Sequence, residues 1–192
     1  GPFGNIAHGC CSVVSDQLAL GYADYVLTEA GFGADLGFEK FMHIKARLND
    51  LEPAAAVIVA SVRALKSHGG VPLRSLDAAN KEALVKGMSN LKHLIGMIKS
   101  FNLPVVVAVN SFPTDDSEET ELVKSLSIEA GAEHAVVSKV YEEGGEGGLD
   151  LADAVIKAAD DSPDLISYMY ELSDSLEDKI SSLATKVYNA TG

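Results

Sequence analysis

The sequence predicts an α/β fold with a parallel sheet covered by helices on both faces, and two observations lead to this prediction. Several short runs are apolar at every position, as in strands that are buried on both faces. Stretches of helical periodicity lie between these runs. Strands that alternate with helices need crossover connections, which leave the strands parallel and place helices on the faces of the sheet.

The four expected strands are short and rich in β-branched residues, the composition that favours strands over helices. They lie at 25–28, 56–60, 104–110 and 135–140. Helical periodicity is found over 12–20, 36–48, 76–101 and 118–130. In the third of these helical stretches, Leu84, Leu91 and Ile95 recur at spacings of seven and four, which predicts one apolar face. Each expected strand therefore has a helix beside it in the chain.

The later part of the chain is expected to be helical only. The fourth helical stretch has Asp115, Asp116 and Ser117 as candidate N-caps and Gly131 as its C-cap. After the last strand, helices are expected at 149–159, 165–170 and 176–188. Because no linker, repeat or low-complexity tract interrupts the chain, residues 1–192 are expected to form a single α/β unit.

The composition excludes several classes of protein. With 192 residues, 47% of them hydrophobic, the chain is long enough for a sizeable core. Its net charge of −13 argues against a broad surface for nucleic acid or anionic lipid. No apolar run reaches the ~20 residues that span a bilayer. The adjacent Cys10 and Cys11 suit neither a mutual disulfide nor a metal site, so no metal ligand is assigned in this chain. Two free thiols fit a reducing compartment, for which we expect the cytoplasm, although a mature organellar protein would have the same pattern.

Three of the four loops after the expected strands carry an aromatic residue. These residues are Phe32, Phe112 and Tyr141, in a chain with only six Phe and six Tyr. Ligands of open parallel sheets bind beyond the carboxyl ends of the strands, so the rings could enclose a flat ligand such as a pterin or purine. The alternative is that each ring only packs at the edge of the core.

The remaining candidates are basic residues and glycines in the same loops. Arg63, Lys66 and His68 could bind a carboxylate or phosphate, or could only support their loop. Gly144 and Gly145 precede a helix whose N-terminus could receive an anion, although structural turns also use such glycines. His8 is equally ambiguous. No segment has the Gly-x-x-x-x-Gly-Lys-Ser/Thr pattern of a phosphate-binding loop.

Long motifs in this chain resemble the formate–tetrahydrofolate ligases. The motifs lie at 1–9, 28–37, 59–70, 107–115 and 143–148, and the likeness covers essentially the whole chain. The resemblance implies a P-loop-NTPase-like sheet in a cytoplasmic, homotetrameric enzyme. Such an enzyme joins formate to tetrahydrofolate through formyl phosphate, using ATP with Mg²⁺ and a monovalent cation as activator.

The resemblance also assigns roles to residues of this chain. It implies that Phe112 and Tyr141 enclose the pterin, with Phe32 and Pro113 beside them, although family members carry Trp at the position of Tyr141. Asn110, Gly144 and Gly145 are expected on the nucleotide side. No catalytic residue is assigned.

The chain is expected to be the middle-to-late part of a longer ligase core. In the family, the phosphate-binding loop lies upstream of the segment that resembles this chain. We therefore expect a partial enzyme that is inactive alone, with an unpaired sheet edge where the missing N-terminal half docks. Two alternatives stay open, a non-catalytic folate- or nucleotide-binding module and an assembly subunit of a split enzyme.

Overall fold

A computed structural model describes residues 10–163 and 165–191, so the motif at 1–9, with His8, lies outside the described residues. Contacts within the chain gather into two compact units. One unit is Ala54–Ile166, and the other combines Gly1–Pro53 with Ser167–Gly192. We call them the sheet unit and the terminal unit and describe each by itself.

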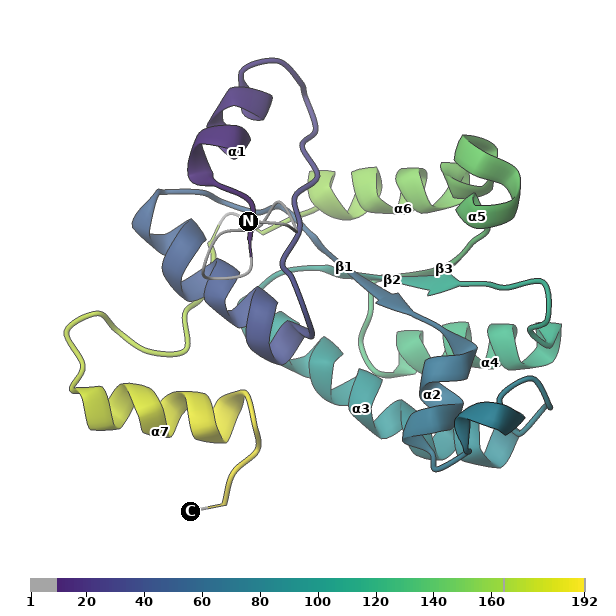
Figure 1. Cartoon of the computed structure of the whole chain (residues 1–192). Helices are drawn as coiled ribbons and strands as arrows, with labels where there is room; N and C mark the ends of the chain where they lie inside the picture. Colours follow the sequence, from purple (N-terminus) through teal and green to yellow (C-terminus); the bar gives the residue numbers. More distant parts are fainter. Residues whose placement is uncertain (1–9, 164, 192) are drawn as a thin grey trace. The chain divides into compact units, whose positions relative to one another are not determined.

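The sheet unit contains a three-stranded parallel sheet in the order β1-β2-β3, which confirms the predicted α/β class (Figure 1). The strands are β1 (Ala56–Ala60), β2 (Val105–Asn110) and β3 (His134–Ser138). Val57 lies opposite Val106 in the register, and Val109 lies opposite Val137. The strands predicted at 56–60, 104–110 and 135–140 therefore exist, with small shifts at their ends.

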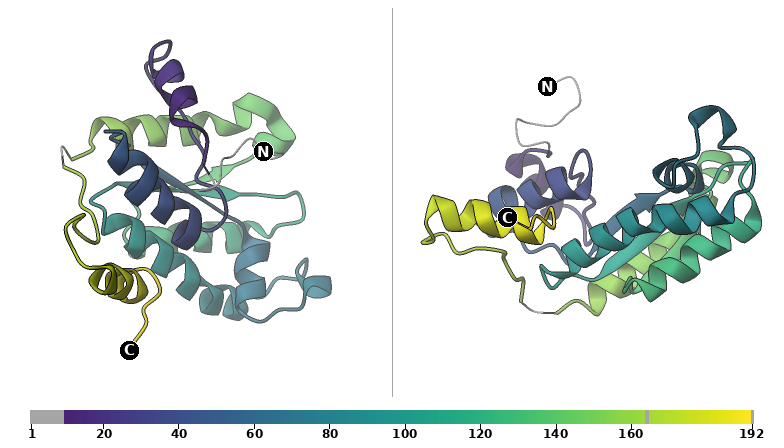
Figure 2. Two further views of the ribbon diagram at one scale, coloured as in Figure 1. Left: turned by 60° about the vertical axis from the view of Figure 1, so that its left-hand side comes forward. Right: turned by 90° about the horizontal axis from the view of Figure 1, so that it is seen from below.

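Helices lie on both faces of this sheet, as predicted (Figure 2). The helical elements of the unit are α2 (Val62–His68), η3 (Leu73–Ser75), α3 (Lys81–Lys99), α4 (Ser117–Glu129), α5 (Val140–Glu143), η4 (Gly144–Gly148) and α6 (Leu149–Asp160). Helices α3 and α4 lie on one face, and α6 packs against β2 and β3 on the other. Asp116 caps α4 by accepting from the backbone N–H groups of Glu118 and Glu119. Gly131 follows α4 with φ +103°, the left-handed geometry expected of a C-terminal glycine.

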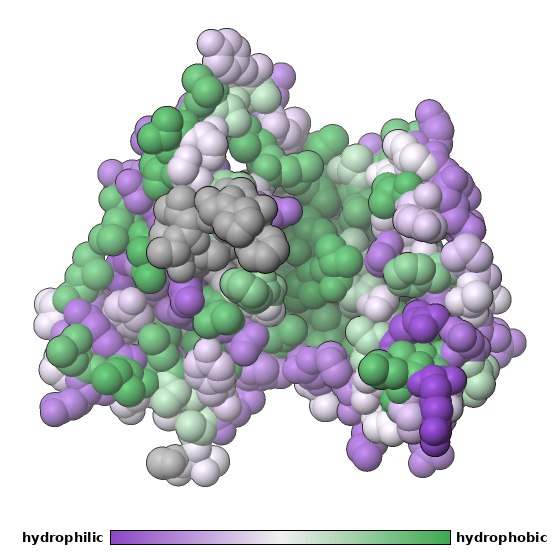
Figure 3. Space-filling view, viewed as in Figure 1, coloured by the Kyte–Doolittle hydropathy of each residue, from purple (hydrophilic) through white to green (hydrophobic). Residues whose placement is uncertain are grey.

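The core of the sheet unit is centred on β2. Val105, Val107 and Val109 are fully buried, while Val57 and Val59 of β1 are 38% and 70% exposed. Hydrophobic residues accordingly gather over the strands on the face drawn in Figure 3. The strand β1 is thus an edge strand with the apolar sequence of an interior one.

Glycine allows α2 and α3 to approach closely. A Cβ atom on Gly87 would lie 1.8 Å from the carbonyl oxygen of Leu65, and one on Gly69 would lie 1.9 Å from that of Ala83. The region 61–70, expected as a loop, is mostly the helix α2, which spans Val62–His68. Ser61 opens this helix because its hydroxyl accepts from the N–H of Ala64.

The terminal unit is helical. It contains α1 (Val13–Leu20), the π-helical turns η1 (Ala34–Phe38) and η2 (Phe41–Ala46), and α7 (Leu176–Lys186). Together η1, η2 and the α-helical residues beside them form one helical run over 34–48. Buried Lys45 in this run pairs with Asp16 of α1 at 2.5 Å. The helices predicted at 12–20, 36–48 and 176–188 are present.

Two predicted elements are wrong, a strand in the terminal unit and a helix at the boundary of the two units. Residues 25–28 form no strand, and the nearest pairing is an isolated antiparallel bridge between Cys10 and Ala30. Without a neighbouring strand, four residues of high β-propensity cannot bury both faces. Residues 165–170, predicted as a helix, are irregular because their backbone groups bond to side chains of other elements, such as Met169 N–H to His43 and Tyr170 C=O to Arg47.

No helix in the described ranges, 10–163 and 165–191, combines the length and apolar character that crossing a bilayer requires.

Candidate functional site

A hollow of ≈ 200 Å³ lies at the carboxyl ends of β1 and β2, where open parallel sheets bind their ligands. It is lined by Ile58, Val59, Ala60, Ser61, Ala64, Leu65, His68, Asn90, Leu91, Leu94, Asn110 and Phe112. Three predicted site residues, His68, Asn110 and Phe112, therefore come together. The lining is mostly apolar with a few polar groups, the usual character of a small-molecule site.

Backbone hydrogen bonds fix the loop that carries Phe112. The N–H of Ser111 donates to the carbonyl of Ser138 on the neighbouring strand at 3.0 Å. The N–H of Phe112 donates to the Asp115 carboxylate at 2.9 Å, and the N–H of Asp115 donates back to the Phe112 carbonyl at 2.9 Å. Phe112 is thus held at the wall of the hollow by a closed turn, and Pro113 is exposed beside it.

His68 and Asn90 form the polar side of the hollow. The Asn90 amide lies 3.2 Å from Nδ1 of His68, which joins the end of α2 to the middle of α3. Asn90, Leu91 and Leu94, all on α3, also line the hollow but were not among the predicted site residues. The available signal was an Asn in the middle of a long helix, because Asn favours caps and turns over helix interiors.

Lys66 and Arg63 are held by carboxylates of the chain itself. Lys66 is 1% exposed, and its ammonium donates to Glu119 at 2.9 Å and to the carbonyl of Ala78 at 3.1 Å. Arg63 pairs with Asp77. Glu119 has a second partner, the backbone N–H of Asn80. These contacts tie α2 to α4 and to the segment before α3.

Tyr141, Gly144 and Gly145 lie beyond β3 in α5 and η4. The Tyr141 side chain is 79% exposed and is not among the residues lining the hollow. Gly144 has φ +60° and ψ −142°, a conformation reserved for glycine, which leads the chain from α5 into η4. The N–H of Lys139 donates to the carbonyl of Gly147 at 3.0 Å and closes this turn.

Phe32 belongs to the terminal unit. Its backbone has φ 68°, which is unusual for a bulky residue, and its side chain is 81% exposed. An exposed ring on a strained backbone is more typical of a functional position than of a packing one.

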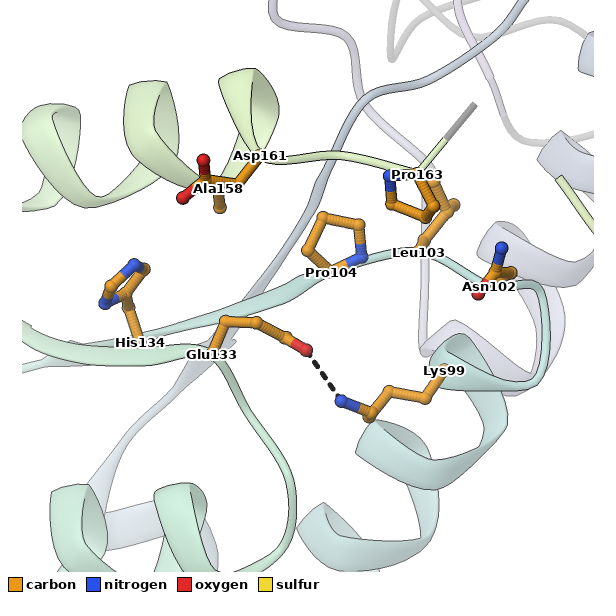
Figure 4. A pocket seen from close by; sticks show the side chains of 9 residues that line it. All are labelled: Lys99, Asn102, Leu103, Pro104, Glu133, His134, Ala158, Asp161 and Pro163. Atoms are coloured by element: carbon orange, nitrogen blue, oxygen red, sulfur yellow. Dashed lines mark hydrogen bonds and ion pairs between the residues drawn. The ribbon is translucent and has the colours of Figure 1, made fainter. Parts of the chain in front are cut away.

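A second hollow, also ≈ 200 Å³, lies at the opposite end of the sheet, where β2 and β3 begin (Figure 4). Lys99 and Glu133 pair across it at 2.6 Å, and Glu133 also accepts from the N–H of Val105. Burial tends to raise the pKa of Glu133, but the hydrogen bonds from Lys99 and Val105 outweigh it and lower the pKa below its ordinary value. This hollow lies at the amino ends of the strands, and none of the predicted site residues lines it.

No group of three or more His, Cys, Asp or Glu residues suited to a metal ion occurs in the described part of the chain.

Comparisons with known proteins agree with the motifs. The family model for formate–tetrahydrofolate ligase matches residues 1–192. A formate–tetrahydrofolate ligase of Bacillus licheniformis is 51% identical over all 192 residues, and the chain spans 34% of that relative. A match over every residue at this identity shows that the chain belongs to the formate–tetrahydrofolate ligase family.

Proposed function

We propose that this chain is part of an ATP-dependent ligase that forms 10-formyltetrahydrofolate from formate and tetrahydrofolate through formyl phosphate. Its own contribution is the pterin site. The observation that supports this most is the hollow at the carboxyl ends of β1 and β2, with Phe112 on its wall. A mostly apolar site beside a fixed aromatic ring suits a flat heterocycle.

The residues of this chain would bind and orient the folate. Phe112, with Pro113 beside it, would stack on the pterin, and Tyr141 and Phe32 would supply further ring surface. Asn110, Gly144 and Gly145 would lie toward the nucleotide. Stacking fixes the plane of the ring, which positions the amine that attacks the formyl group.

The residues described here do not fit a Mg²⁺–ATP phosphate site. The sequence lacks the phosphate-loop pattern, and Lys66, the buried cation near the hollow, is already paired with Glu119. We therefore assign the nucleotide phosphates, Mg²⁺ and the monovalent cation to no residue here. The rest of the ligase polypeptide would supply these sites, and the chain would be inactive alone. The family further suggests a cytoplasmic homotetramer, which light scattering on the complete ligase can test.

Calorimetry with tetrahydrofolate tests the pterin site, on this chain alone and mixed with the upstream half of the ligase. Phe112→Ala should weaken binding by ~1 kcal/mol, about fivefold, because the stacking surface is lost. Tyr22→Ala, which removes an 86% exposed ring, is the matched control. Equal affinity of Phe112→Ala and the unmodified protein would refute the site. Tight binding by the chain alone, unchanged by the upstream half, would favour a folate-binding module over a ligase part.

A further inference from the structure

The exposed ring of Phe32 stands immediately before the helical run 34–48. Since φ at Phe32 is 68°, contacts elsewhere must hold this backbone in place. The start of the run provides one such contact. Gly37 lies so close to the preceding turn that a Cβ atom on it would be 1.5 Å from the carbonyl oxygen of Gly31. The position of Phe32 therefore depends on the position of the run.

The C-terminal segment holds the run through His43 and Arg47, which are four residues apart. Glu39, four residues before His43, binds the His43 ring from within the run. His43 lies 2.8 Å from Glu39 through Nδ1, and its Nε2 accepts from the N–H of Met169 at 3.2 Å. Because Nε2 accepts, the ring proton lies on Nδ1 and donates to Glu39. His43 is 2% exposed and stacks on Tyr170, with ring centroids 4.4 Å apart.

Arg47 makes the second set of contacts with that segment. Its guanidinium donates to the carbonyl of Tyr170 at 2.6 Å and pairs with Glu171 at 3.1 Å. The guanidinium also lies 4.3 Å from the ring centroid of Tyr168. Planar stacking combined with directed hydrogen bonds is specific to arginine, so the segment is fixed in orientation as well as in distance.

Beyond these contacts the chain forms α7 and returns to the other end of the run. Ser182 and Lys186 of α7 both donate to the carbonyl of Met169. The hydroxyl of Tyr188, just after α7, then donates to the carbonyl of Asp35 at 3.1 Å. Burial, and after it the nearby carboxylates of Asp35 and Glu39, raise the pKa of Tyr188, so its hydroxyl keeps the proton that it donates. Asp35 is three residues after Phe32.

We propose that residues 167–190 are a brace that holds the Phe32 ring in position for the planar ring of folate. The positioning residues are Tyr188 in the brace, and His43 and Arg47 in the helical run, which bind the brace. This inference rests on the proposed function. The brace contacts the helical run near both of its ends, at Asp35 and at Arg47. It would lower the entropic cost of binding by fixing the ring before folate arrives. Its loss should therefore raise KM for tetrahydrofolate and leave kcat unchanged.

A double-mutant cycle in the complete ligase tests the brace through Phe32. Tyr188→Phe and Arg47→Met should each raise KM for tetrahydrofolate about threefold to tenfold at constant kcat, whereas Tyr22→Phe should change neither. In a Phe32→Ala background, the same two substitutions should have no further effect, because no ring remains to be positioned. An equal rise in KM in both backgrounds would overturn the proposal.

Hydrogen exchange on the chain itself gives an independent readout. Arg47→Met should speed exchange of the amides at 33–37 about tenfold and leave the amides of β2 unchanged. Unchanged exchange at 33–37 would also overturn the brace. If Phe32→Ala alone leaves KM unaltered, the folate-binding role of Phe32 fails, and the exchange result then decides the brace separately.

Discussion

Lys66 and Glu119 form a buried ion pair that joins α2 to α4, the two helices that follow β1 and β2. Both side chains are at most 2% exposed, and each has a further backbone partner. A buried pair of this kind adds little net stability, but removing one partner leaves the other charge buried and unpaired, which is destabilising. Through it, the helix that carries His68 is fixed relative to the helix after the Phe112 turn.

Lys66→Met should lower the free energy of unfolding by ~3–5 kcal/mol, because Glu119 would be left buried and unpaired. Urea denaturation followed by circular dichroism measures this change. Lys81→Met removes a lysine paired with Glu118 at the surface, where both partners are exposed, and should change little. If the two substitutions lowered the free energy of unfolding by similar amounts, burial of the Lys66–Glu119 pair would not be the cause of the effect.

Glu133 makes stability depend on pH. Its pKa is lower in the folded protein than in the unfolded chain, so the contribution of Glu133 is present above the ordinary carboxyl pKa, 4.5. This contribution is lost as the pH falls through the lower folded value. Unfolding free energies measured between pH 7 and pH 3 should fall more steeply for the unmodified chain than for Glu133→Gln. Parallel curves for the two proteins would exclude this carboxylate as a source of acid sensitivity.

The close contact between α2 and α3 depends on Gly69 and Gly87, and Gly96 provides a comparison for Gly87. A methyl group at Gly87 would meet the carbonyl oxygen of Leu65, whereas one at Gly96, on the same helix, meets nothing within 4 Å. Both substitutions replace glycine by a better helix former, so the difference between their effects on stability should come from packing.

Gly87→Ala should destabilise the protein by ~1–3 kcal/mol through overpacking, and Gly96→Ala should stabilise it by up to ~1 kcal/mol. Thermal unfolding of the two variants gives the comparison. Because His68 and Asn90 lie on these two helices, Gly87→Ala should also widen the hollow and weaken tetrahydrofolate binding. A Gly87→Ala protein as stable as Gly96→Ala would contradict the close approach of the helices.

The same elements show what the sequence could predict. The strand at 56–60 and the cap Asp116 depend on local composition, and both are present as predicted. The strand at 25–28 and the helix at 165–170 are absent, because the conformation of such short segments depends on their tertiary partners. No described strand pairs with residues 25–28. In residues 165–170, Arg47 and His43 form hydrogen bonds with backbone groups of Tyr170 and Met169. In the hollow, Phe112 was predictable from its place after a strand. The unusual place of Asn90 inside a helix was visible in the sequence, but its place in the hollow was not, because only the folded chain brings α3 beside β1.

The outer edge of β1 is the most exposed apolar part of the sheet. No described strand pairs with it, and the strand carries no charge, proline or bulge of the kind that protects natural edges. Since the chain spans 34% of its relative, we expect a strand from the rest of the ligase to occupy this edge.

Adding the remaining ligase polypeptide should slow hydrogen exchange at the β1 amides more than tenfold, because a new strand would pair with them. Val59→Lys should weaken that association. Val85→Lys, at a 51% exposed position of α3, should not. If β1 becomes protected in the isolated chain as its concentration rises, a second copy occupies the edge and the expectation is wrong.

The terminal unit combines residues up to 53 with residues from 167 onward, so the whole sheet unit lies between its two parts in the sequence. During synthesis on the ribosome, the sheet unit is contiguous and can fold as soon as it emerges. The stretch around Phe32 leaves the exit tunnel much earlier, whereas Met169, Tyr170 and Tyr188, which contact the helical run after it, emerge only after the whole sheet unit. The nascent polypeptide therefore completes its Phe32 loop only when translation of this region is nearly over.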